Sequence, residues 1–60
     1  MQEIIKHFGG QSALAKKLNV DKAAVSQWVS YGFFPPKRAI QIERITNGLF
    51  KAVDMIEHEG

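Results

Sequence analysis

The chain has 60 residues, 45% of them hydrophobic and 23% charged, and its eight Lys and Arg against six Asp and Glu give a formal charge of +2. This length indicates one domain, residues 1–60, and the absence of cysteine excludes disulfides and the usual cysteine-containing zinc sites. No apolar run approaches the roughly 18 residues of a membrane span or forms the apolar centre of a secretory leader, so we expect a cytoplasmic protein.

The first two predicted helices are separated by a pair of glycines. Residues 1–8 carry apolar side chains at helical spacing, and Gly9 and Gly10 end this segment because paired glycines make a helix interior costly. The second helix spans about residues 11–18, with apolar side chains on one face and lysines on another. Asn19 follows it, at a position where helices often end in a left-handed residue.

Capping residues and prolines delimit the next two helices. Asp21 predicts an N-cap whose carboxylate lies near the free backbone N–H groups of a helix over about residues 22–30. Gly32 is a natural stop for that helix. Pro36 suits the first turn of a fourth helix, which Asn47-Gly48 should end.

A fifth helical segment is expected over residues 49–57. Its apolar face would consist of Leu49, Val53 and Ile56. Residues 40–42 alternate apolar and polar side chains, which is the one place where a strand remains an alternative. Residues 58–60 should be frayed. Together these patterns predict an all-α fold, a compact domain of four to five helices.

Residues 11–30 have the pattern of a helix-turn-helix. Two helices joined by a turn of three or four residues approach closely, and Ala15 supplies the small side chain that this approach needs. Asn19 supplies the permissive backbone of the turn. The expected core of the domain consists of Leu14, Leu18, Val20, Val25, Trp28, Ile42 and Ile45.

The predicted third helix has an outward strip of polar and small side chains. The strip consists of Lys22, Ala23, Ser26 and Gln27. Gln pairs with the edge of adenine, Lys donates to guanine, Ser serves either role, and an alanine methyl packs on the methyl group of thymine. These four residues are therefore candidates for DNA base contacts. The alternative is an ordinary solvated helix face.

The segment HFGGQSALAKKLNVDKAAVSQW resembles the helix-turn-helix of the Cro repressors of lambdoid phages and related prophage regulators. The following PPKRAIQIERITNG is similar to the fourth helix of the all-helical Cro branch, so the resemblance covers about residues 5–49. Asn19 departs from the glycine that is usual in this motif, which a left-handed Asn makes a mild exception. Some Cro proteins have a β-hairpin in the C-terminal half, but the helical spacing of the apolar residues favours helices here.

The resemblance implies a sequence-specific transcriptional repressor. Such a protein occupies palindromic double-stranded operator DNA as a homodimer, with the helix over about residues 22–30 in the major groove. We expect it to act in the cytoplasm of a bacterial host cell, as a dimer that is weak in the absence of DNA.

The charge is distributed unevenly along the chain. Residues 1–44 have seven Lys and Arg against three acids, a net of +4, whereas residues 45–60 have one Lys against three acids, a net of −2. The basic part suits the phosphate contacts that position a protein on DNA. The candidates lie at the starts of the second and fourth helices: Gln11, Ser12, Lys37 and Arg38. The alternative for each is a solvated basic surface.

Apolar residues beyond the needs of a small core suggest a partner surface. The candidates for a dimer interface are Phe33, Phe34, Ile40, Phe50 and Met55. A two-fold dimer would read half-sites about one helical turn apart. The alternative is that the aromatic residues cover the open end of the core.

Enzymatic and ligand-binding functions find no support in the sequence. His7 and His58 lie at opposite ends with no nucleophile near either in the sequence, so no catalytic residues, metal site, cofactor or small-molecule ligand are expected. The second functional hypothesis is a helix-turn-helix used as a protein-interaction module, such as a small antitoxin or adaptor. Repression and activation are not distinguished by the sequence.

Overall fold

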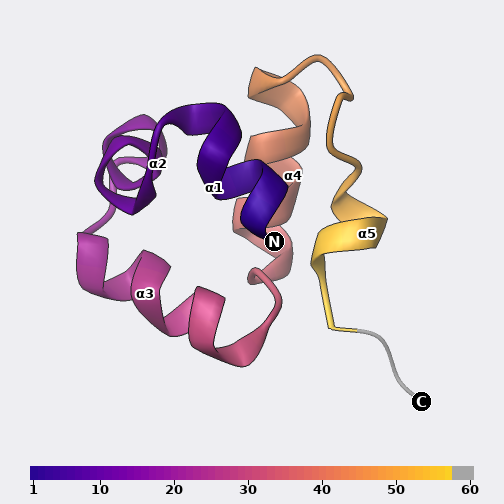
Figure 1. Cartoon of the computed structure of the whole chain (residues 1–60). Helices are drawn as coiled ribbons and strands as arrows, with labels where there is room; N and C mark the ends of the chain where they lie inside the picture. Colours follow the sequence, from indigo (N-terminus) through magenta and orange to yellow (C-terminus); the bar gives the residue numbers. More distant parts are fainter. Residues whose placement is uncertain (58–60) are drawn as a thin grey trace.

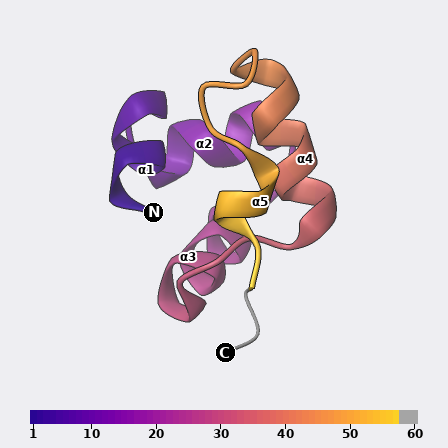
Figure 2. The same ribbon diagram turned by 90° about the vertical axis from the view of Figure 1, so that its right-hand side faces the viewer.

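The computed structural model describes residues 1–57 and consists of five helices joined by short connections (Figures 1 and 2). The helices are α1 (Gln2–Phe8), α2 (Gln11–Leu18), α3 (Lys22–Tyr31), α4 (Pro36–Ile45) and α5 (Ala52–Met55). No strand occurs in the described residues, and residues 40–42, where a strand was an alternative, lie inside α4. The all-α prediction is confirmed. The expected fraying of residues 58–60 lies outside the described part.

The helices surround one hydrophobic core. α2 packs on α3 as the two arms of the predicted helix-turn-helix, α1 packs on α2, and α4 lies between α2 and α5 (Figure 1). The buried side chains are Ile4, Leu14, Ala15, Leu18, Val25, Phe34, Ala39, Ile42 and Met55. Val20 and Trp28, both predicted for the core, are partly buried and pack against it.

The turn between α2 and α3 depends on a left-handed residue. Asn19 has φ 58° and ψ 47°, which is the conformation expected from its position after α2. Its N–H donates to the carbonyl of Lys16, and the N–H of Val20 donates to the carbonyl of Ala15, with N···O distances of 3.2 and 2.9 Å. These bonds satisfy carbonyls at the end of α2, so the turn is tight without a glycine.

Replacing Asn19 with alanine should lower the free energy of unfolding by about 1 kcal/mol, because an alanine Cβ is strained in the left-handed region. Asn19→Gly should be nearly neutral, since glycine adopts this conformation freely but loses more entropy on folding. Urea denaturation followed by circular dichroism measures both. An alanine variant as stable as the parent would show that the left-handed turn is not maintained in solution.

Asp21 occupies the N-cap of α3, but its role differs from the prediction. Within residues 1–57 its carboxylate makes no capping hydrogen bond. Its main-chain carbonyl accepts instead from the N–H of Ala24 at 3.0 Å. The carboxylate near the helix start still interacts favourably with the helix dipole.

α4 ends just before Asn47-Gly48, as expected, whereas the start of α5 differs from the prediction because of a hydrogen bond from a distant residue. α4 ends at Ile45, and the hydroxyl of Thr46 donates to the carbonyl of Ile42 at 2.7 Å. The predicted helix over residues 49–57 is reduced to four residues, 52–55. Its start is set by Glu43, whose Oε1 accepts from the N–H of Ala52 at 2.6 Å.

Three apolar residues that were placed on buried faces are exposed. Ile45, predicted for the core, is 45% exposed. Leu49 and Val53, predicted for the buried face of the fifth helix, are 62% and 61% exposed, whereas Met55 is buried. The short α5 presents a different face to α4 than a helix starting at residue 49 would.

The described residues contain no helix long and apolar enough to span a membrane. In the same part of the chain, no three His, Asp or Glu side chains are grouped so as to hold a metal ion.

Candidate nucleic-acid interface

The outer face of α3 carries the four candidate base-contact residues. Because Val25 is buried and Trp28 packs against the core, the opposite side of the helix points away from the protein. Lys22, Ala23, Ser26 and Gln27 are all exposed there. None of these side chains packs in the core, so the strip is free to contact a ligand.

A hydrogen bond joins this strip to the start of α2. The hydroxyl of Ser26 donates to Oε1 of Gln11, with an O···O distance of 2.6 Å. The structure therefore brings a candidate base contact and a candidate phosphate contact together. Ser12, the next residue of α2, is exposed at the same helix end. Helix N-termini favour anions because their first N–H groups have no partner within the helix.

Arg38 was predicted to contact phosphate, but its guanidinium group has hydrogen-bond partners within the protein. It is half-buried, and its Nη1 donates to the carbonyl of Leu18 at 3.3 Å and to Oε1 of Gln41 at 2.9 Å. It therefore joins α4 to the C-terminal end of α2. The neighbouring Lys37 is exposed. The two pairs of phosphate candidates thus lie toward opposite ends of α2, with Gln11 at its start.

Ser30 belongs to the same face of α3 but was not singled out from the sequence. It is exposed, and it follows Ser26 by four residues and Gln27 by three, which places the three side chains together on a helix. The sequence placed the end of the helix near Ser30, whereas α3 continues to Tyr31. The i+4 spacing from Ser26 would have identified it.

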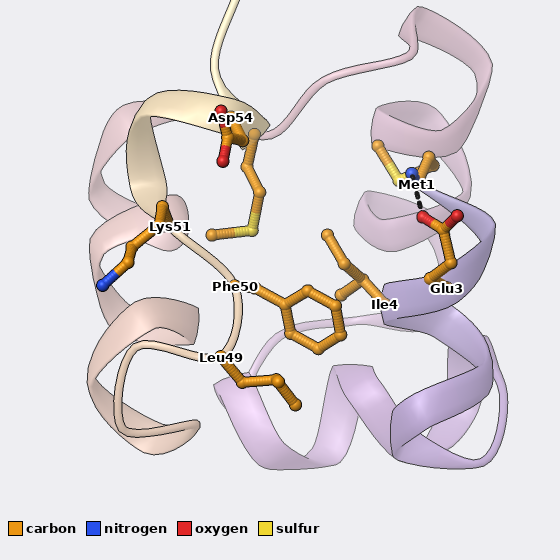
Figure 3. A pocket seen from close by; sticks show the side chains of 8 residues that line it. Met1, Glu3, Ile4, Leu49, Phe50, Lys51 and Asp54 are labelled. Atoms are coloured by element: carbon orange, nitrogen blue, oxygen red, sulfur yellow. Dashed lines mark ion pairs between the residues drawn. The ribbon is translucent and has the colours of Figure 1, made fainter.

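Two of the five residues predicted for a dimer interface are core residues. Phe34 is 0% exposed and Met55 is also buried, so their prediction as partner contacts is corrected. Phe50 is half-buried. Phe50 and Met55 line a hollow of about 230 Å³ between α1 and the segment 49–55, opposite Ile4 (Figure 3). These side chains cover the end of the core.

The other two dimer candidates remain accessible. Phe33 is half-buried and stacks on Tyr31, with 5.9 Å between ring centroids. Ile40 is 47% exposed on the outer face of α4. Both remain predictions.

Comparison with known proteins gives the family. The family model described as "DNA-binding transcriptional regulator Cro" matches residues 1–60. The chain belongs to the Cro family. It is a family of DNA-binding regulators, not of enzymes.

Two relatives carry the same name. The regulatory protein cro of Salmonella phage P22 is 44% identical over 50 residues, which cover 83% of this chain and 79% of the relative. The regulatory protein cro of Pseudomonas phage D3 is 41% identical over 58 residues, covering 90% of this chain and 75% of the relative.

A solved Cro structure has the same fold. The Cro protein from the putative prophage element Xfaso 1 in Xylella fastidiosa strain Ann-1 matches with a TM-score of 0.81 and 39% sequence identity. The match covers 90% of this Cro-family chain and 83% of that one.

Proposed function

We propose that this Cro-family protein is a sequence-specific transcriptional repressor that occupies palindromic operator DNA as a homodimer. In this proposal α3 lies in the major groove, and Lys22, Ala23, Ser26 and Gln27 contact base edges. Gln11, Ser12 and Lys37 contact phosphates. Arg38 chiefly holds α4 against the C-terminal end of α2, and its charge adds to the positive electrostatic potential of the protein surface.

The observation that carries the proposal is the exposed strip on α3 and its hydrogen bond to α2. A helix of this diameter fits the major groove, where each base pair presents a distinct pattern of donors and acceptors. The start of α2 would then face the DNA backbone beside the groove, as the first helix does in helix-turn-helix complexes with DNA. Repression follows if the occupied site overlaps a promoter.

Replacing Gln27 with alanine should cost about 1–3 kcal/mol of binding free energy at particular base pairs, because a base-reading amide is lost. Replacing Lys37 with alanine should instead weaken binding to all sequences alike and reduce the salt slope by about 1. Sites selected from random DNA by the parent protein supply the duplexes. Fluorescence anisotropy at several salt concentrations measures both variants.

Lys17→Ala is the matched control for Lys37, since it removes the same charge from an exposed position on α2. It should have a smaller effect on the salt slope. Equal losses on random and selected DNA for Gln27→Ala would contradict base reading by α3. Parent binding that does not depend on salt would favour a protein-interaction module instead.

The outer face of α4 has the features of a partner surface. A hollow of about 360 Å³ lies there, lined by Lys37, Ile40, Gln41, Arg44 and Ile45. Ile40 and Ile45 supply its apolar surface, and the exposed cations Lys37 and Arg44 form what we call its basic rim. Two α4 helices placed directly against each other would bring like charges together, so the hollow suits an acidic segment with apolar side chains.

The segment of residues 49–57 has this chemistry. Leu49 and Val53 are exposed apolar residues, and the two exposed acids, Asp54 and Glu57, outnumber the one exposed cation, Lys51. We therefore propose a reciprocal dimer, in which this segment of each copy lies on the α4 hollow of the other. A two-fold arrangement of this kind closes with two identical contacts.

The proposed place of action is the cytoplasm of a bacterial host. The two relatives named above come from phages of Salmonella and Pseudomonas. A regulator of phage promoters acts where those promoters are transcribed.

A further inference from the structure

The hydrogen bond between Ser26 and Gln11 determines how the serine hydroxyl is used. A hydroxyl has one hydrogen to donate and two lone pairs that accept. The Ser26 hydroxyl donates to Oε1 of Gln11, with an O···O distance of 2.6 Å, and within residues 1–57 this is the one side-chain hydrogen bond of Ser26. The hydroxyl therefore faces outward from α3 with only its lone pairs free.

We propose that Gln11 is a specificity-determining residue that makes Ser26 an obligate hydrogen-bond acceptor toward DNA. In the major groove, only the amino groups of adenine and cytosine donate, whereas guanine N7 and O6 and thymine O4 accept. Ser26 should therefore select adenine or cytosine at one position of each half-site. This inference rests on the proposed function, since it assumes that α3 enters the major groove.

The same geometry leaves the other end of the Gln11 amide free. With Oε1 occupied by Ser26, the Nε2 group of Gln11 still has its two hydrogens. Gln11 is the first residue of α2, so Nε2 lies at the helix end that is proposed to meet a phosphate. The Gln11 amide would thus connect a DNA phosphate contact to a base contact. Its orientation decides whether Ser26 donates or accepts at the base.

Two substitutions of Gln11 separate this role from a simple phosphate contact. Gln11→Ala frees the Ser26 hydrogen, so the hydroxyl can donate to guanine or thymine. The preference for adenine or cytosine at that position should fall about fivefold, the contribution of one ordinary hydrogen bond. Gln11→Glu keeps an oxygen at the same distance and should retain the preference while weakening binding to every sequence, because a carboxylate repels phosphate.

The measurement uses the full chain and an operator selected from random DNA by the parent protein. Duplexes carrying each of the four base pairs at every half-site position are titrated by anisotropy, with circular dichroism verifying that each variant folds. Ser26→Ala should remove the preference at the same position that Gln11→Ala affects, with the other positions unchanged.

Three outcomes would overturn the inference. The first is a uniform loss over all four base pairs for Gln11→Ala, which would make Gln11 a phosphate contact alone. The second is a loss of the preference in Gln11→Glu. The third is a preference for guanine or thymine at the Ser26 position. If the parent protein selects no sequence at all, the proposed function fails, which distinguishes that failure from failure of this inference.

Discussion

Replacing Phe34 with alanine is expected to remove a large share of the free energy of unfolding, roughly a third or more of the total. Phe34 is completely buried, and its ring meets that of Trp28 edge-on, with 5.6 Å between centroids. Truncating a buried Phe costs about 3–5 kcal/mol. At about 0.05–0.15 kcal/mol per residue, a domain of this length has a total stability of roughly 3–9 kcal/mol. Thermal unfolding followed by circular dichroism measures the loss.

Tyr31→Ala is the matched control for Phe34→Ala. Tyr31 is also aromatic and lies three residues away, but it is 62% exposed. Its replacement should change the unfolding free energy by less than about 1 kcal/mol. If Phe34→Ala melts at the same temperature as Tyr31→Ala, the Phe34 side chain is not part of the core in solution.

Exchanging charges across the proposed dimer interface should break and then restore the dimer. Arg44→Glu places an acid on the rim of the α4 hollow, opposite the partner's acidic segment, and Asp54→Lys places a cation opposite the partner's basic rim. Because each contact occurs twice, either change should cost about 2 kcal/mol, roughly a thirtyfold increase in the dimer dissociation constant. The double variant should recover most of that loss. Sedimentation equilibrium over a range of protein concentrations measures the constants.

Lys16→Glu controls for the change in net charge. Lys16 is exposed on α2, outside the hollow, and the substitution changes the charge as Arg44→Glu does. It should leave the dimer dissociation constant nearly unchanged. A double variant as weak as either single variant would refute the reciprocal contact, and a parent protein that is monomeric even on a palindromic operator would refute the dimer.

The helices α1 to α4 could be predicted because their limits are set by local chemistry. Gly9, Asn19 and Gly32 all have positive φ at helix ends, and Pro36 is the first residue of α4. A left-handed residue or a proline acts on its own neighbours, so its effect can be read from the sequence. The start of α5 depends on the carboxylate of Glu43, nine residues earlier, and no local pattern indicates that contact.

The error at Ile45 has a geometric cause. Ala39, Ile42 and Ile45 repeat every three residues, whereas an α-helix turns once in 3.6 residues. Each step of three therefore rotates the side chain by about 60° away from the previous one. Ala39 and Ile42 still face the core, and Ile45 has turned to the outer face of α4.

The candidate site was predictable in part for related reasons. The outward strip of α3 follows from helical periodicity, and its exposure agrees with the expectation. The sequence did not indicate the hydrogen bonds of Arg38, or which of the adjacent Phe33 and Phe34 is buried. Arg38 takes a carbonyl of α2 as its partner, and Phe34 rather than Phe33 turns inward, where its N–H donates to the carbonyl of Met55 at 2.7 Å. Such partners come from elements that are distant in the sequence.

The short connections of this fold have a consequence for how quickly the regulator becomes active. Helices that are neighbours in the sequence pack on one another, α1 on α2, α2 on α3 and α4 on α5. Chains dominated by such local contacts fold in microseconds to milliseconds. A ribosome adds about 5–20 residues per second, so synthesis of 60 residues takes several seconds. The amount of folded protein should therefore follow its rate of synthesis without a folding delay.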